Sequence, residues 1–147
     1  MSSEAQMWKD HVRPVLYTAM LDPHRIENAV ALGMPDVNYL YGWIELKHKH
    51  EWPKRDDTPL RLTHFTPEQK TWLYRRHHLG GRAFLLLRVK NEFLLFDGKM
   101  ARAVVGNVCR IALIKAALAY SPKGFDWDVF GNHLVPPEDK RYVHEGR

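Results

Sequence analysis

The chain contains a single cysteine, Cys109, among its 147 residues. One cysteine excludes an intrachain disulfide and a metal centre built from several thiolates, and we expect Cys109 to be a small buried residue. The nine histidines lack the Cys or His spacings of a zinc site, so we interpret them as surface or phosphate-contacting residues. Internal repeats, low-complexity tracts and glycine-rich phosphate loops are also lacking.

The sequence has no apolar run that would cross a bilayer. The apolar stretch within residues 107–120 is too short for this and is interrupted by Arg110 and Lys115. Residues 1–4 lack the basic and hydrophobic regions of a secretory signal. We therefore expect no membrane partner and a cytoplasmic location.

The composition favours one folded domain with a polyanionic partner. Apolar residues make up 45% of the chain, which excludes a disordered tail and predicts a single domain over residues 1–147. The formal net charge is +5 and the sequence pI is about 9.4, and both values suit nucleic acid as the partner. The basic residues that carry this interpretation gather in the middle of the chain and are Lys47, Lys49, Lys54, Arg55, Arg61, Arg75, Arg76 and Arg82.

Two acids and one lysine are spaced as a functional site would need them. Side chains alternate across a strand, so a strand over residues 43–47 places Glu45 and Lys47 together on one face, which we expect to be exposed to solvent. A preceding strand over residues 37–41 that folds back on it brings Asp36 opposite Glu45 or Lys47. Taken alone, Asp36 is typical of a turn and the other two of a solvated strand face, but their joint occurrence favours a site.

These three side chains suit phosphodiester hydrolysis. Two carboxylates are hard oxygen ligands for Mg²⁺, or for Mn²⁺ in its place, and such an ion keeps waters and binds substrate phosphate. The Lys47 ammonium can orient or deprotonate the attacking water and offset the negative charge on the phosphate. The pattern therefore predicts a metal-dependent nuclease.

The surrounding residues resemble the PD-(D/E)XK nuclease superfamily, with Pro35-Asp36 as its PD and Glu45-Leu46-Lys47 as its (D/E)XK element. The leading Gly33 and the downstream segment Thr66-Pro67-Glu68-Gln69 are similar to the virus-type replication-repair nuclease (VRR-NUC) group and to Holliday junction resolvase-like nucleases. The similarity runs from about residue 4 to about residue 96. It implies an α/β fold with a restriction-endonuclease-like core, in which helices flank a central mixed β-sheet. The catalytic residues that it implies are Asp36, Glu45, Lys47 and Gln69.

Gln69 has a second explanation. Thr66 and Gln69 also form a capping box at the start of a helix, with Pro67 at the first helical position. Helix capping therefore explains Gln69 about as well as catalysis does.

The resemblance also implies a metal-binding acid from the first helix, beside Asp36 and Glu45. Glu4 and Glu27 are the candidates. We favour Glu4 because it opens an amphipathic helix that the spacing of apolar residues predicts over residues 4–16. The structural alternative is that Glu4 only stabilises the helix dipole.

The remaining elements fit around this motif. The helix from Pro67 should end after Leu79, and residues 83–89 and 92–96 should form a hairpin. We expect a basic loop over residues 48–60, in which Trp52 either stacks on an unpaired base or packs against the sheet. Residues 107–120 predict an amphipathic helix within a C-terminal helical extension that spans residues 107–147.

The expected function is that of a Mg²⁺-dependent endodeoxyribonuclease acting on branched or recombination-intermediate DNA, as a resolvase or repair nuclease of phage type does. The resemblance suggests a homodimer that works in a bacterial or phage-infected cell. Two alternatives stay open: a sequence-specific restriction or homing endonuclease, and a non-catalytic DNA-binding module on the same fold. The expected DNA contacts are Lys49, Lys54, Arg55, Arg75 and Arg76.

Overall fold

Six strands form one mixed sheet in the computed structural model of the chain, and their spatial order follows the sequence from β1 to β6. The structure describes residues 3–27, 31–139 and 141. Its strands are β1 (His24–Arg25), β2 (Val37–Tyr39), β3 (Gly42–Lys49), β4 (Ala83–Val89), β5 (Glu92–Asp97) and β6 (Ala119–Ser121). Only β3 and β4 run parallel in this sheet, and every other neighbouring pair is antiparallel.

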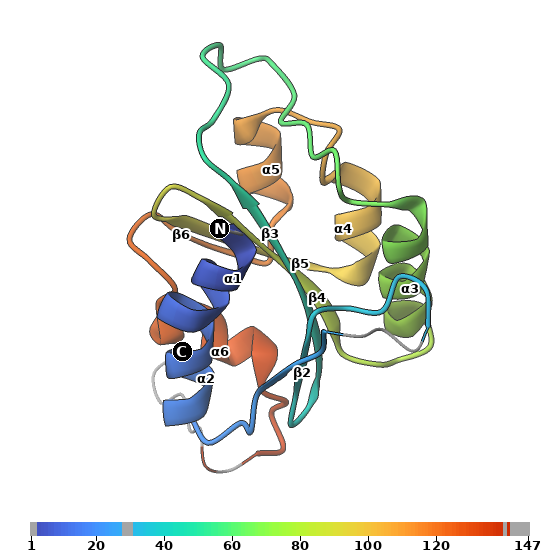
Figure 1. The fold of residues 1–147 in the computed structure, drawn as a ribbon, viewed down its shortest axis with the longest axis vertical. Helices are drawn as coiled ribbons and strands as arrows, with labels where there is room; N and C mark the ends of the chain where they lie inside the picture. Colours follow the sequence, from blue (N-terminus) through green and yellow to red (C-terminus); the bar gives the residue numbers. More distant parts are fainter. Residues whose placement is uncertain (1–2, 28–30, 140, 142–147) are drawn as a thin grey trace.

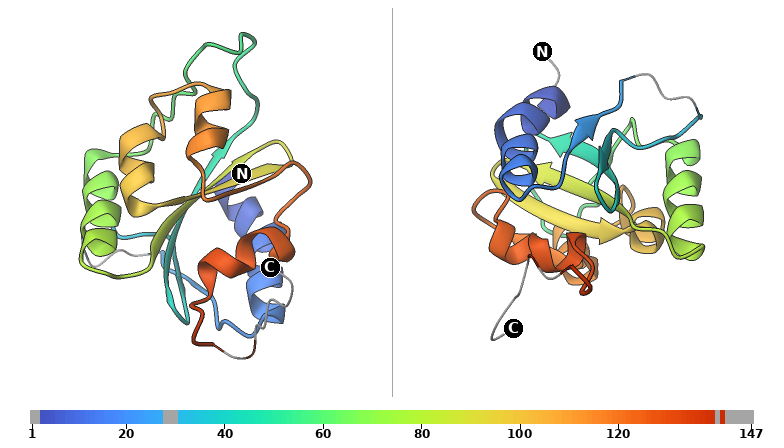
Figure 2. Two further views of the ribbon diagram at one scale, coloured as in Figure 1. Left: turned by 180° about the vertical axis from the view of Figure 1, so that it is seen from behind. Right: turned by 90° about the horizontal axis from the view of Figure 1, so that it is seen from below.

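Helices cover both faces of the sheet (Figures 1 and 2). One face carries a continuous helical segment, α1 (Ser3–Met7), η1 (Trp8–Val12) and α2 (Arg13–Thr18), together with α6 (Trp127–Leu134). The other face carries α3 (Pro67–His78), α4 (Gly98–Val104) and α5 (Arg110–Ala116). None of the helices in the described part of the chain is long and apolar enough to span a membrane.

Each face has its own apolar core. On one face, Leu46 of β3 packs in a buried cluster with Leu16 of α2. On the other, Leu85 of β4 packs in a second buried cluster with Leu73 of α3. The sheet therefore has no water-exposed face at its centre, and β3 and β4 lie between two helical layers.

The predicted fold class, an α/β domain with a central mixed sheet flanked by helices, is confirmed. Helix α3 connects the parallel strands β3 and β4, as a parallel pair requires. Its capping box at Thr66 and Gln69 is present, and the helix ends at His78, with Leu79 as its C-cap and Gly80 next to it at φ +92°. The hairpin of β4 and β5 is also confirmed.

Three expected elements differ in the structure. The helix expected over residues 107–120 is shorter, because the chain leaves α5 and pairs as β6 with the outer edge of β5, where the N–H of Leu118 donates to the carbonyl of Leu95 at 2.7 Å. Pairing satisfies edge backbone groups that a longer helix would leave open. Residues 107–147 therefore include a strand as well as helices.

The basic loop begins at residue 50, later than expected, because His48 and Lys49 belong to β3. Cys109, which we expected to be buried, is half-buried and is the N-cap residue of α5.

A buried hydrogen bond joins the sheet to α6. The hydroxyl of Tyr39 in β2 donates to the carbonyl of Leu134 at 2.6 Å, and Tyr39 is 2% exposed. This bond links residues that lie 95 positions apart in the sequence.

We predict that Tyr39→Phe lowers the free energy of unfolding by about 1–2 kcal/mol, because the Leu134 carbonyl loses a buried donor. Urea denaturation measures this change. Tyr17→Phe is the matched control, since Tyr17 is 66% exposed, and it should change stability by less than about 0.5 kcal/mol. Equal effects of the two substitutions would contradict the prediction.

Candidate active site

Asp36 lies where β2 and β3 part. The last paired residues at this end are Val37 of β2 and Ile44 of β3, so Leu46 lies beyond the paired region. The backbone N–H of Leu46 donates to Oδ2 of Asp36 at 3.0 Å. The Asp36 side chain thus takes the place of the missing strand partner, and this register brings it level with Glu45, as the hairpin predicted.

Glu45 and Lys47 share one face of β3, as alternation predicted, but the expectation that this face is exposed to solvent is wrong. Glu45 is 1% exposed and Lys47 is 2% exposed. Their neighbours on β4 are Leu85 and Leu87, and both belong to the apolar cluster under α3. Because α3 crosses over both parallel strands, it covers the acid and the lysine together with these leucines.

The Lys47 ammonium is held by three acceptors. It lies 3.0 Å from Oε2 of Glu45. It donates to Oε1 of Gln69 at 3.1 Å and to the backbone carbonyl of His64 at 2.9 Å. An ammonium has three N–H donors, so these contacts use all of them.

Gln69 serves the helix and the site at once. Its backbone N–H donates to Oγ1 of Thr66 at 3.2 Å, and its Oε1 accepts from the N–H of Thr66 at 3.0 Å, which completes the capping box. The same Oε1 accepts from Lys47, while Nε2 donates to Oε2 of Glu45 at 3.3 Å. The two explanations drawn from the sequence are therefore compatible, because one side chain caps α3 and orients both charged groups.

The environment of the Glu45 carboxyl group disfavours its charged form. Burial and the nearby Asp36 carboxylate raise the pKa of Glu45 to about 8, although Lys47 acts in the opposite direction. Among the described residues, Oε1 of Glu45 finds no hydrogen-bond partner although it is buried. A buried carboxylate oxygen that faces a second carboxylate calls for a cation. Asp36 and Glu45 therefore have the chemistry to hold a divalent cation.

Glu4 is connected to this site through another residue. Its carboxylate pairs with the imidazole of His64, whose carbonyl accepts from Lys47. Glu27, the alternative acid, is exposed. No group of three or more His, Cys, Asp or Glu side chains within residues 3–27, 31–139 and 141 is placed to hold a metal ion. A metal-binding role for Glu4 or Glu27 stays a prediction.

The expected DNA-binding residues lie on the outside of the domain. Lys54 and Arg55 are exposed in the loop after β3, where Arg55 lies 3.4 Å from Asp57, and Lys49 is half-buried at the end of that strand. Arg75 and Arg76 are exposed in the second half of α3.

Trp52 packs inward rather than standing free in the loop. Its indole Nε1 donates to Oε2 of Glu92 at 2.8 Å, and the guanidinium of Arg110 lies 5.1 Å from its ring centroid. The packing alternative for Trp52 is therefore supported over stacking on a base.

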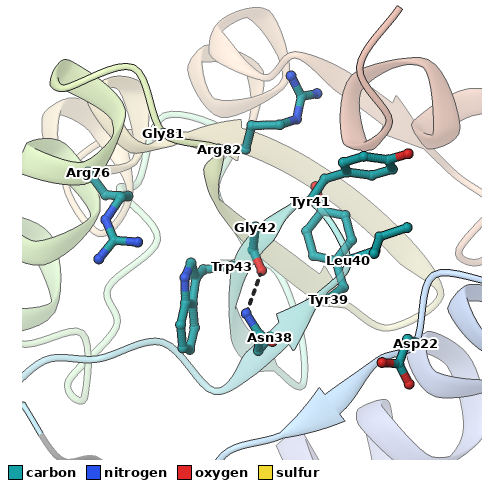
Figure 3. Close-up of a pocket in the computed structure, with 10 residues that line it drawn as sticks. All are labelled: Asp22, Asn38, Tyr39, Leu40, Tyr41, Gly42, Trp43, Arg76, Gly81 and Arg82. Carbon is teal, nitrogen blue, oxygen red and sulfur yellow. Dashed lines mark hydrogen bonds between the residues drawn. The ribbon is translucent and has the colours of Figure 1, made fainter. Parts of the chain in front are cut away.

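A cavity of about 460 Å³ opens at the turn end of the β2–β3 hairpin (Figure 3). Trp43 stands on its wall, on the same face of β3 as Glu45, and Arg76 of α3 faces the same space. The floor includes Asn38, whose Nδ2 donates to the carbonyl of Gly42 at 3.2 Å. The cavity thus combines an aromatic ring, an amide and a guanidinium, and Trp43 of β3 is its residue nearest in the strand to Glu45.

His64 is a contributor that the sequence did not reveal, and Trp43 was placed on the strand face of Glu45 but given no role. His64 lies 60 residues from its partner Glu4, and no local pattern links residues so far apart. Trp43 had a local signal, because it precedes Glu45 by two positions and must share its strand face.

Gly33, the leading residue of the motif, touches the start of α3. A Cβ atom built on Gly33 would lie 2.4 Å from the carbonyl oxygen of Glu68 and 2.9 Å from the backbone nitrogen of Gln69. Gly33 also has a φ of +84°. The loop that carries Asp36 therefore rests directly on the helical turn that carries Gln69, and only glycine permits this approach.

No protein-family model matches the chain, and no curated protein matches it. Among solved structures, a Holliday junction resolvase, Hjc, from the hyperthermophilic archaeon Archaeoglobus fulgidus is similar with a TM-score of 0.44 and 20% sequence identity. The similarity covers 67% of this chain and 75% of that chain.

We predict that Gly33→Ala destabilises the protein by about 1–3 kcal/mol more than Gly80→Ala does. Both glycines have a positive φ, but a Cβ on Gly80 would meet nothing within 4 Å. The pair of substitutions therefore separates the contact with α3 from the backbone strain. Urea denaturation of both variants measures the difference, and equal losses would show that the close approach to Glu68 does not matter.

Proposed function

We propose that this protein is a metal-dependent endonuclease that hydrolyses phosphodiester bonds of DNA. The observation that supports this most strongly is the convergence of Asp36, Glu45, Lys47 and Gln69 at the point where β2 and β3 part. Surface acids and lysines need no such arrangement. A buried lysine paired with one carboxylate oxygen of Glu45, while the other oxygen, Oε1, has no hydrogen-bond partner among the described residues, costs stability, and a function explains why the pair is kept.

In this proposal Asp36 and Glu45 hold Mg²⁺, or Mn²⁺ in its place. The bound cation would supply Lewis-acid activation of the attacking water and charge for the phosphate. Lys47 contributes a fixed positive charge to the negative phosphate during attack. Gln69, in the first turn of α3, hydrogen-bonds to both the Lys47 ammonium and the Glu45 carboxylate and so fixes their relative positions.

The DNA backbone would run over the basic surface on the α3 side of the domain. The proposed contacts are Lys49, Lys54, Arg55, Arg75 and Arg76. Arg76 borders the cavity of Figure 3, where Trp43 offers a flat apolar surface to a base and Asn38 an amide. The motif resemblance favours branched DNA as the substrate and a homodimer as the active form.

We predict that the wild-type protein cuts four-way junction or splayed-arm DNA in Mg²⁺ or Mn²⁺ but not in EDTA. Asp36→Asn should lower the cleavage rate by more than about 100-fold, because it removes one ligand charge. Asparagine keeps an oxygen acceptor for the Leu46 N–H, so the fold at the parting of β2 and β3 should survive. Labelled junction, splayed-arm and linear duplex substrates are compared in one gel assay.

The controls separate catalysis from binding and from folding. Asp36→Asn should still bind junction DNA, and its thermal unfolding should resemble that of the wild type. Lys47→Met combined with Glu45→Gln removes both buried charges without leaving one unpaired, and it should also be inactive while folded. Binding by the wild type with no cutting of any substrate would contradict the prediction and favour a non-catalytic module or a sequence-specific enzyme whose target is not among these substrates.

We further predict that Arg76→Ala weakens DNA binding and reduces the slope of log affinity against log salt by about 1, as loss of one phosphate contact does. Lys123→Ala changes the net charge equally, but it lies in the segment between β6 and α6 and should leave the slope unchanged. Fluorescence anisotropy over a salt series measures both. Equal slopes of log affinity against log salt for the two variants would show that the DNA backbone does not contact Arg76.

A further inference from the structure

The Lys47 end of the site is closed in this structure, and a short segment closes it. Residues 63–65 lie against the Lys47 end of β3: the His64 carbonyl accepts from the ammonium at 2.9 Å, and the Phe65 ring centroid lies 5.6 Å from Nζ. Phe65 is itself buried, at 5% exposure. With all three of its donors in use, the ammonium cannot meet a phosphate until one acceptor leaves.

The three acceptors differ in how firmly they are held. Glu45 belongs to the central strand β3, and Gln69 is fixed in the capping box of α3. The His64 carbonyl lies in the irregular segment that precedes Thr66, the N-cap of α3. The acceptor most easily replaced is therefore the His64 carbonyl.

One side-chain contact ties this segment to the first helix. The imidazole of His64 pairs with the carboxylate of Glu4, and both side chains reach solvent, at 47% and 21% exposure. The pair stands on the wall of a cavity of about 590 Å³ that is also lined by His48, Lys49 and His50. There is thus open space directly beside the contact, and Lys49 and Glu51 give its wall charges of both signs.

We propose that Glu4 and His64 form a latch that holds residues 63–65 over Lys47, and that substrate opens it when a phosphate oxygen replaces the His64 carbonyl at the ammonium. Glu4 and His64 are then positioning residues that control access to Lys47. The identity of the ligand rests on the proposed nuclease function, whereas the latch itself does not. An exposed pair of this kind contributes modestly, so breaking it raises the open population a few-fold.

The latch is tested first without DNA or metal. Lys47 is modified with a small amine-reactive reagent, and its rate relative to exposed Lys54 is read by peptide mass spectrometry. A buried lysine reacts only from the open state, so Glu4→Gln and His64→Ala should each raise the Lys47 rate about two- to fivefold. The double variant should show no further rise, because both residues act through one contact. His50→Ala, a histidine of the same cavity that does not pair with Glu4, should leave the rate unchanged.

The second measurement uses the DNA substrate. The KM for DNA of Glu4→Gln and of His64→Ala should fall by the same factor by which Lys47 labelling rises, because both report the open population. If labelling rises but no DNA is ever cut, the latch is supported and the nuclease proposal fails.

Two results would overturn the latch. One is an unchanged Lys47 labelling rate in both single variants. The other is a loss of Mn²⁺ affinity of tenfold or more, by calorimetry, when Glu4→Gln is introduced into the wild type and into the His64→Ala background alike. That result would make Glu4 a metal ligand, as the sequence resemblance implies.

Discussion

The buried ion pair between Glu45 and Lys47 constrains everything around it. The two groups lie 3.0 Å apart, and neither side chain is more than 2% exposed. Moving two charges out of water costs more than their attraction returns unless the remaining donors and acceptors are satisfied. Replacing such a pair by apolar residues of similar volume is often neutral or stabilising in proteins. The pair is therefore a cost that the neighbouring backbone and side chains are arranged to offset.

The offsetting contacts come from residues that also build the fold. Asp36 completes the backbone hydrogen bonds of β3 and at the same time raises the pKa of Glu45. Gln69 caps α3 and bonds to both charged groups. Gly33 lets the Asp36 loop touch the turn that carries Gln69. Because these residues contribute to both the fold and the site, a loss of activity after substitution can be interpreted only together with the measured stability of the variant.

The sequence predicted what depends on local rules. Alternation along β3 put Glu45 and Lys47 on one face, and the spacing of Thr66 and Gln69 predicted the capping box. The burial of that face was not predictable, because it depends on where the crossover helix α3 comes to rest. The pairing of Glu4 with His64 and the addition of β6 to the sheet edge were not predictable either. Both join segments that lie far apart in the chain, and no local sequence pattern links such segments.

Full engagement of the Lys47 ammonium has a consequence for how such a site can work. A lysine with three acceptors is well placed but has no donor left for a ligand. Losing an acceptor from β3 or α3 would disturb the sheet or the helix cap, whereas losing the one from residues 63–65 disturbs a segment outside regular structure. The cheapest opening therefore leaves Asp36, Glu45 and Gln69 in place and uncovers the ammonium beside them. The carboxylates of Asp36 and Glu45 can thus stay fixed while residues 63–65 move. Such an arrangement allows both the burial that the fold imposes on Lys47 and the access that a phosphate requires.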